Sequence, residues 1–359
     1  MVSATATDWR DPQPLDQAFG LPGSVFTDPD ILRIEADAVF AGSWQYVAHA
    51  SQLPAPGDYR VVDIAGRPML LLRDEAGALR ALSNICRHRG GPLATEDGCD
   101  LKQLRCRYHG WTYDLRGCLK SGPELDMIKG MALSEVRLPS AQVAQWHGLV
   151  FVALDPVAPP FAEFIEGIDD RLAGHDLDSQ RLHSRVNYDV HCNWKVYVEN
   201  FLEGYHVPHV HPALNALIDY KSYVTECGRW HSMQRSPLED SVSFYGEGEV
   251  RYFYLWPNTM LDVMPGGLQI NRVRPVGTDH CRVEAEHYYA PGIAEREATR
   301  IAQDQDLSEV TQQEDFEICV RLQRAFASGA YVPGRIHPVR ENCLHHWQEL
   351  YRQAMRVKG

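Results

Sequence analysis

Two short stretches of this sequence pair a cysteine with a histidine at spacings that suit metal binding. Cys86 lies two residues before His88, and Cys106 lies three residues before His109. Two thiolates and two imidazoles can hold a two-iron cluster, with both thiolates on one iron and both imidazoles on the other. Zinc also accepts sets of two cysteines and two histidines, so these four residues alone leave a structural zinc site open.

A third stretch, in the middle of the chain, carries Glu203, His206 and His211. Two histidines and a carboxylate suit a mononuclear iron(II) that keeps open positions for oxygen. On a helix from residue 193 to about residue 206, the polar side chains Asn200, Glu203 and His206 would share one face at roughly 100° per residue. An electron-delivering cluster beside an oxygen-activating iron would be the metal content of an oxygenase.

The carboxylate that completes this set must come from elsewhere, and three acidic residues of the late helix are candidates. At roughly 100° per residue, Asp315 falls inside an apolar arc of this helix, whereas Glu314 lies at its edge and Glu317 outside it. A carboxylate within a buried stripe is costly unless a cation or a hydrogen-bond donor pairs with it. We therefore expect Asp315 to be the third iron ligand.

The composition excludes several classes of partner. The formal net charge of −13 argues against nucleic acid and against an anionic membrane surface. Nine cysteines without paired spacing do not indicate a disulfide framework. Residues 1–20 are polar and do not resemble a signal peptide, and no apolar run is long enough to span a membrane. We expect a cytoplasmic protein.

The order of predicted elements indicates two domains, which the length of 359 residues allows. The Pro-rich segment 155–160 is the clearest boundary. Before it, we predict a helix over 28–44, followed by short strands at 59–64, 68–73, 79–84 and 149–154. Both Cys/His pairs would lie at turns between strands. After it, an α+β region is predicted, with a strand at 184–192, the helix from 193, strands within 249–290 and a long helix over about 294–326.

The paired loops match a known pattern. They resemble the Rieske family motifs C-x-H-R-G and C-x-x-H-G-W residue for residue, and the resemblance covers residues 44–155. It implies a β-sandwich domain that binds a [2Fe-2S] Rieske cluster through Cys86, His88, Cys106 and His109. Zinc sites more often separate paired ligands by two to four residues, which makes the Cys-x-His pair unusual for zinc.

The segment from Asn193 to His211 is similar to the iron-site motif of the α subunits of Rieske non-heme iron oxygenases. This resemblance implies that His206 and His211 bind Fe(II) with a downstream acid, and that Asn200 and Glu203 serve catalysis. In that family an acidic residue at the position of Glu203, often Asp, joins this iron site to a cluster histidine of a neighbouring subunit, which corresponds here to His109. Homotrimers are implied as well.

The resemblance predicts a fold of three parts. Residues 1–43 would pack on the catalytic domain, 44–155 would form the Rieske domain, and 156–359 would form a helix-grip (START-like) domain with a curved antiparallel sheet. Electrons would come from NAD(P)H through a separate ferredoxin or flavin/iron–sulfur reductase, because the chain has neither a Gly-x-Gly-x-x-Gly fingerprint nor a second cysteine cluster.

The implied reaction uses O2 to hydroxylate, dihydroxylate or oxidatively demethylate a small molecule, either an aromatic compound or a quaternary ammonium or N-methyl compound. Aromatic side chains of the predicted sheet could stack on a ring or surround a cation. The expected lining residues are Tyr252, Phe253, Trp256, Met260, Val263 and Gln269. Residues 314–319 look similar to the choline, betaine and carnitine oxygenases. Two alternatives remain open, a Rieske-type electron-transfer protein with a non-catalytic ligand-binding domain and a zinc-stabilised binding protein.

Overall fold

The computed structural model describes residues 8–172, 174–239, 241 and 243–357. The chain divides into two compact units, a smaller one of residues 40–159 and a larger one formed by the residues before 40 together with those from 160 onward. The predicted limits 44 and 155 fall just inside the smaller unit, and the described part of the N-terminal segment up to Val39 belongs to the larger one. No helix of the described chain is long and apolar enough to cross a membrane.

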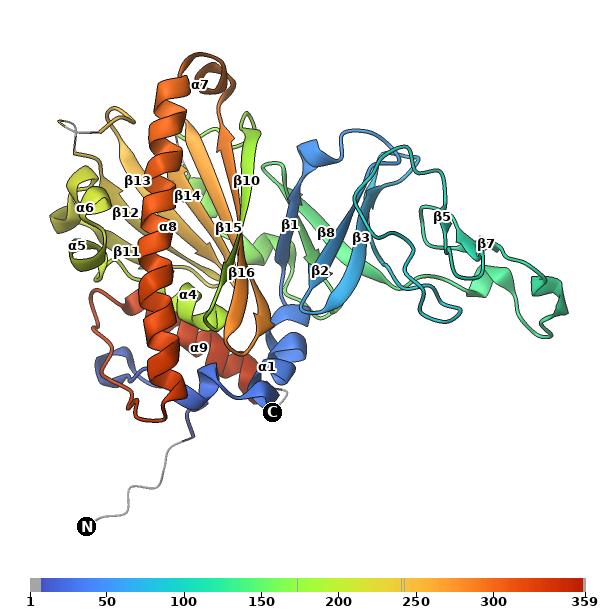
Figure 1. The fold of residues 1–359 in the computed structure, drawn as a ribbon, viewed down its shortest axis with the longest axis horizontal. Coiled ribbons are helices and arrows are strands. Elements are labelled where there is room, and N and C mark those ends of the chain that lie inside the picture. The colour runs from blue at the N-terminus through green and yellow to red at the C-terminus, as the bar shows by residue number, and fades with distance from the viewer. Residues whose placement is uncertain (1–7, 173, 240, 242, 358–359) are drawn as a thin grey trace, which may run out of the picture. The chain divides into compact units, whose positions relative to one another are not determined.

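The smaller unit is built from two antiparallel sheets (Figure 1). Its six-stranded sheet has the order β1-β9-β8-β4-β3-β2, and its three-stranded sheet has the order β5-β6-β7. The strands are β1 (Gln45–His49), β2 (Tyr59–Ile64), β3 (Arg67–Arg73), β4 (Leu79–Ser83), β5 (Leu104–Arg105), β6 (Thr112–Tyr113), β7 (Leu119–Ser121), β8 (Ser140–Trp146) and β9 (Leu149–Ala153). Short 3-10 turns connect them at Ala50–Gln52, Leu125–Met127 and Leu133–Glu135.

Strand β3 explains how the two sheets pack. Its side chains alternate between two apolar clusters, with Leu70 and Leu72 in one and Met69 and Leu71 in the other. The first cluster also contains residues of β5, β6 and β7, so the small sheet covers one face of the large sheet. Because the first cluster includes Cys86 and Cys106, both thiols are buried in the layer between the sheets.

The larger unit is a seven-stranded antiparallel sheet with helices (Figure 1). Its order is β10-β16-β15-β14-β13-β12-β11. The strands are β10 (Arg181–Val190), β11 (Val224–Cys227), β12 (His231–Pro237), β13 (Glu249–Leu255), β14 (Thr259–Met264), β15 (Gly267–Gly277) and β16 (His280–Tyr289). The helices are α1 (Pro29–Glu35), α2 (Phe161–Phe164), α3 (Ile168–Arg171), α4 (Trp194–Phe201), α5 (Val207–Val210), α6 (Pro212–Leu217), α7 (Pro291–Arg296), α8 (Ala298–Ala327) and α9 (Asn342–Val357).

This architecture confirms the predicted α+β class with antiparallel sheets, and it corrects several helix limits. The helix predicted over 28–44 is α1 followed by a π-helical stretch, Ala36–Ala41. The helix predicted to reach His206 ends at Phe201, so Glu203 and His206 lie on the connection to α5. The late helix is divided into α7 and α8, and α9 was not predicted.

Helix α8 runs along one face of the seven-stranded sheet (Figure 1). Its buried side chains include three polar ones, Asp304, Gln312 and Gln323. A helix stripe this polar would normally face water, because burying an unpaired polar group costs free energy. Here Asp304 and Gln312 line the cavities at the candidate iron site described below, whereas Gln323 accepts a hydrogen bond from the Asn193 amide.

A buried carboxylate, Glu35 at the end of α1, ties the base of α4 to α9. Its oxygens accept hydrogen bonds from Trp194 Nε1 at 2.7 Å, from Lys195 Nζ at 2.6 Å and from the Tyr351 hydroxyl at 2.5 Å. Glu35 and Lys195 are completely buried and form an ion pair. The network fixes the first turn of α4, and α4 in turn carries Asn200 towards the candidate iron site.

We predict that Lys195→Met destabilises the larger unit by about 3–5 kcal/mol, because it leaves the Glu35 carboxylate buried without its cation. Thermal unfolding followed by circular dichroism measures the effect. The matched control is Lys221→Met, since the Lys221 side chain is exposed. An unfolding midpoint for Lys195→Met equal to that of the control would contradict this role for the pair.

Candidate metal centres

The two Cys/His pairs lie on two loops of the smaller unit that have the same backbone geometry. In the first loop, the Cys86 amide donates to Gly91 O at 2.9 Å, and the Gly90 amide donates to Cys86 O at 3.0 Å. In the second, the Cys106 amide donates to Trp111 O and the Gly110 amide donates to Cys106 O, both at 2.9 Å. Gly90 and Gly110 have φ angles of 73° and 75°, a region that favours glycine.

The loops place the thiols inside and the imidazoles outside. Cys86 and Cys106 are buried, whereas His88 is exposed and His109 is half-buried. The two imidazole rings lie 4.6 Å apart between centroids, at an interplanar angle of 74°. Trp111 stacks on His88 at 4.8 Å and so holds that ring in place.

Close approach of the two loops supports a shared metal group. A Cβ atom on Gly91 would lie 2.9 Å from Cys106 Sγ, so a side chain at this position would collide with the thiol of the opposite loop. The Tyr113 hydroxyl lies 3.3 Å from Cys86 Sγ, where it can donate a hydrogen bond to a thiolate. Two buried thiols and two adjacent imidazoles fit the ligand set of a Rieske cluster.

The second candidate centre is formed by His206, His211 and Asp315 in the larger unit. One ligand atom from each residue can be chosen so that all three lie within 4.8 Å of one another. His211 Nε2 is 3.1 Å from His206 Nε2 and 3.0 Å from Asp315 Oδ1. His206 comes from the connection before α5, His211 lies between α5 and α6, and Asp315 comes from α8.

Each of these three side chains is oriented by a polar neighbour. Glu203 Oε1 lies 2.7 Å from His206 Nδ1, Glu314 Oε2 lies 2.7 Å from His211 Nδ1, and Asn200 Nδ2 donates to Asp315 Oδ1 at 2.5 Å. A carboxylate on the far nitrogen of a histidine fixes its tautomer and leaves Nε2 free for a metal. The geometry thus fits a facial set of two histidines and one carboxylate.

The late-helix acids have different positions, as the helical arc predicted. Asp315 faces the two histidines, and Glu317 points to solvent, where it pairs with Arg321. Glu314 contacts Nδ1 of His211, the ring nitrogen away from Asp315. Its position at the edge of the helical arc did not predict this contact. Burial opposes a charge on His211, yet the carboxylates of Asp315 and Glu314 raise the pKa of this histidine, so the site attracts a positive charge.

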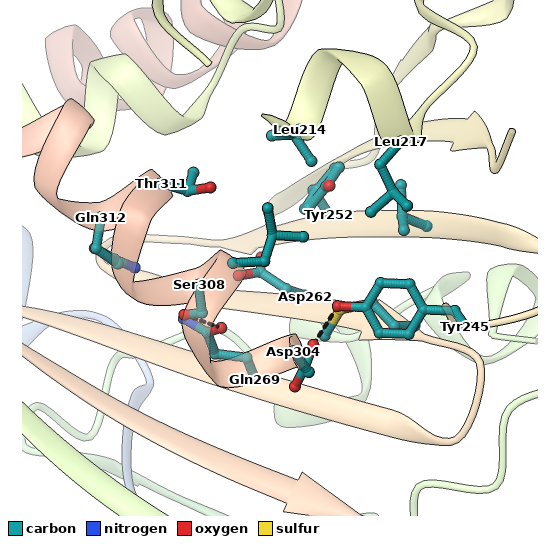
Figure 2. A pocket seen from close by; sticks show the side chains of 13 residues that line it. Leu214, Leu217, Tyr245, Tyr252, Asp262, Gln269, Asp304, Ser308, Thr311 and Gln312 are labelled. Atoms are coloured by element: carbon teal, nitrogen blue, oxygen red, sulfur yellow. Dashed lines mark hydrogen bonds between the residues drawn. The ribbon is translucent and has the colours of Figure 1, made fainter. Parts of the chain in front are cut away.

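A cavity of about 90 Å³ opens onto the three residues. Its lining consists of Tyr197, Asn200, Phe201, Glu203, His206, Val207, His211, Leu214, Tyr223, Gln234, Tyr252, Asp262, Asn271, Thr311, Gln312 and Asp315. A second cavity of about 80 Å³ shares five of these residues, Leu214, Tyr252, Asp262, Thr311 and Gln312, and continues along α8. Figure 2 shows this second part, with Asp262 and Asp304 among the side chains that line it.

The structure corrects the predicted pocket lining. Gln269 and Tyr252 line the second cavity, whereas Phe253, Trp256, Met260 and Val263 line neither part. All four are buried in the sheet instead. Side chains of a strand alternate between its faces, and Tyr252 of β13 pairs with Asp262 of β14, so these two residues rather than Phe253 and Val263 face the cavity.

The lining carries an excess of acidic side chains. No Lys or Arg occurs among the described residues that line either part, but Asp262 and Asp304 do. Oδ1 of Asp262 is buried and has no hydrogen-bond partner among the described residues, and Oδ2 accepts only a 3.3 Å bond from Asn271. Burial, together with the charges of Asp304 and Asp315, raises the pKa of Asp262 to about 8.

Comparison with known proteins identifies both domains. Residues 43–135 match the Rieske [2Fe-2S] domain, and residues 177–357 match the catalytic domain of the ring hydroxylating alpha subunit. The chain therefore belongs to the family of Rieske oxygenase alpha subunits. It is the terminal oxygenase component of such a system, in which the Rieske domain binds a [2Fe-2S] cluster and the catalytic domain binds a mononuclear iron.

Three of the similar proteins are named for nitrogen compounds. Choline monooxygenase of Arabidopsis thaliana is 30% identical, over 99% of this chain and 87% of the relative. Putrescine 2-hydroxylase of Ralstonia nicotianae is 28% identical, over 93% of this chain and 95% of the relative. The solved structure of a quaternary ammonium Rieske monooxygenase that oxidises carnitine is 25% identical, with a TM-score of 0.85 over 96% of this chain and 99% of that one.

We predict that Asp315→Ala removes the mononuclear iron and abolishes turnover, whereas the cluster absorption is unchanged. Glu314→Gln keeps the iron but weakens its binding by about 10–100-fold, because the His211 ring loses the carboxylate that orients it. Iron content after dialysis against a graded chelator separates the two effects, and Glu317→Gln is the matched control. Loss of iron from Glu314→Gln with retention in Asp315→Ala would show that the ligand assignment is wrong.

Proposed function

We propose that this protein oxidises a C–H bond of a small organic cation at an iron bound by His206, His211 and Asp315. In the simplest balanced reaction, R–H, O2, two electrons and two protons give R–OH and water. Hydroxylation next to nitrogen releases the substituent as an aldehyde, so the same chemistry covers demethylation. The electrons enter through a cluster bound by the two Cys/His loops.

The observation that carries this proposal is the acidic lining of the pocket. A neutral aromatic substrate would leave Oδ1 of Asp262 buried and unpartnered, which costs free energy. A cationic nitrogen beside Asp262 would supply the missing partner and favour the charged carboxylate. The aromatic side chains Tyr223 and Tyr252 line the same cavity and add an attraction for a cation. Choline, carnitine and putrescine, the compounds named for the relatives, all carry a positively charged nitrogen.

The mononuclear iron, when bound, supplies a place for O2 to bind and be reduced. The protein contributes the orientation of its ligands. Asn200 holds the carboxylate of Asp315 through the hydrogen bond to Oδ1, and Glu203 and Glu314 each accept the Nδ1 proton of one histidine. We assign Asn200 and Glu203 as positioning residues.

Glu203 has a second role in this proposal. Inter-subunit electron transfer has been described for the quaternary ammonium monooxygenase. We propose a homotrimer in which Glu203 joins His206 to His109 of a neighbouring subunit, because one carboxylate can accept an N–H from each of two rings. One oxygen of Glu203 lies 2.7 Å from His206 Nδ1, and the other accepts the His206 amide at 3.1 Å.

A separate NAD(P)H-dependent ferredoxin or flavin/iron–sulfur reductase would reduce the cluster. None of the nine cysteines forms a disulfide, which suits the reducing cytoplasm.

We predict that Glu203→Gln retains both metal centres and the trimer but slows oxidation of the reduced cluster by O2 and substrate by at least about 100-fold. The amide keeps the size of the side chain and loses the charge that accepts both N–H groups. Stopped-flow absorbance of the cluster gives the rate. A variant with intact metals and the wild-type rate would refute the bridge.

Substrate-dependent O2 consumption tests the proposed function. With a surrogate reductase, amines and quaternary ammonium compounds should stimulate uptake and yield an oxidised product, and neutral aromatic hydrocarbons should not. Asp262→Asn should raise KM for the best amine by about 10–100-fold, since the amide cannot balance its charge. Asp279→Asn is the control, because Asp279 is exposed and lines neither cavity. Turnover of aromatic hydrocarbons in preference to every amine would overturn the proposal.

A further inference from the structure

We propose that the substrate is a linear aliphatic amine with two cationic nitrogens and that Asp304 binds the nitrogen remote from the iron. This inference rests on the proposed oxidation of a cation and specifies its chemical class. Three features support it, namely the direction of the cavities along α8, the surroundings of Asp304 and the leucine side chains of the second cavity.

The pocket extends from the iron site along α8. Asp315 borders the iron-side cavity, Asp304 borders the second cavity, and Thr311 and Gln312 of the same helix border both. Eleven positions separate Asp304 from Asp315, which corresponds to about 16 Å along the helix axis. Asp262 of β14 borders both cavities and so lies between the two ends. An elongated substrate fits this arrangement better than a compact one.

Asp304 is a buried carboxylate that forms no ion pair with Lys or Arg among the described residues, and the His287 imidazole, whose pKa is lowered mainly by burial, is the other titratable nitrogen group near it. Its side chain accepts hydrogen bonds from the Tyr245 hydroxyl and from the Tyr289 hydroxyl, the latter at 2.5 Å, and only 4% of the residue is exposed. The nearby Arg300 is engaged elsewhere, because it pairs with Glu297 at 3.1 Å and stacks over the ring of Tyr245. Figure 2 shows Asp304 beside Tyr245 at the pocket wall.

A single ammonium beside Asp262 would leave this second carboxylate uncompensated. A buried charge without a partner is costly, so a second ammonium at Asp304 would be favoured. The second cavity has an apolar part, formed by Leu214, Leu217 and Leu307, beside the polar residues Gln269, Ser308, Thr311 and Gln312. Methylene groups that connect two ammonium groups would pack against these leucines. A substrate with a carboxylate in place of the second ammonium would be repelled by Asp304.

The test compares three ligand series of equal chain length on the wild-type holoenzyme. These are α,ω-diamines of three to six carbons, the matching n-alkylamines, and the matching ω-amino acids. We expect the best diamine to exceed its matched monoamine by at least about 30-fold in kcat/KM, and in affinity for the reduced, oxygen-free enzyme measured by calorimetry, with the amino acid weakest. An ammonium shared between both carboxylates is the competing arrangement, and it predicts that the monoamine equals the diamine.

A variant assigns the effect to Asp304. Asp304→Asn removes the charge and keeps one oxygen to accept one of the two tyrosine hydroxyls, while its Nδ2 can donate to the oxygen of the other. It should reduce the preference for the diamine to less than about threefold by weakening the diamine alone, whereas Asp306→Asn, an exposed change on the same helix, leaves the preference intact. Equal losses for diamine and monoamine would show a structural role for Asp304 and overturn the inference.

The outcomes also separate this inference from the proposed function. If monoamines or quaternary ammonium compounds are oxidised as efficiently as diamines, the inference fails and the oxidation of a cation stands. If no amine of any series binds or is oxidised, both fail. The wild-type comparison needs no variant, so a failure of Asp304→Asn to fold leaves the preference for the diamine testable.

Discussion

Acidic side chains that face the cavities without a compensating Lys or Arg are the constraint on which the catalytic unit depends. Asp315, Asp262 and Asp304 line two adjoining cavities, and Glu314 contacts His211 behind them, yet no Lys or Arg lines either cavity among the described residues. Burying carboxylates in this way is costly unless cations compensate them. Iron at the histidine end and a cationic substrate along α8 would together provide that compensation. The pocket is thus incomplete without its ligands.

The rest of the larger unit holds this unfavourable arrangement in place. The Glu35–Lys195 pair is buried and internally neutral, and it anchors the first turn of α4. Helix α8 spans the length of the pocket, so one rigid element sets the spacing from Asp304 to Asp315. In the smaller unit, two glycine-containing loops bring two buried thiols and two imidazoles together.

The sequence predicted best where residue type and spacing determine geometry. The Cys/His loops and the strand limits of β2, β3, β4 and β9 agree with the prediction to within a residue. The choice of Asp315 over Glu314 and Glu317 followed from helical periodicity, and the structure places these three residues accordingly. Glu203 contacts His206 as expected, although the helix ends earlier, because a spacing of three residues also brings side chains together on a tight connection.

Pocket lining could not be predicted in the same way. Strands β13 and β14 are buried over most of their length, so their sequences lack the alternation that shows which face is which. The predicted lining was therefore wrong by one residue on β14. It named Val263, whereas Asp262 faces the cavities. The partnership of Glu314 with His211, and of Asp304 with two tyrosines, joins residues far apart in the chain and required the fold.

The central claim is that the iron site opens onto a pocket that accepts a cation through Asp262 and Asp304. Electron paramagnetic resonance of nitric oxide bound to the ferrous mononuclear iron tests it most directly, because this signal responds to whatever lies beside the metal. A diamine should change the spectrum of the wild-type protein at low concentration, and the same addition should leave the spectrum of the double variant Asp262→Asn, Asp304→Asn unchanged. A spectrum that responds to neutral aromatic compounds and to no amine would contradict the account.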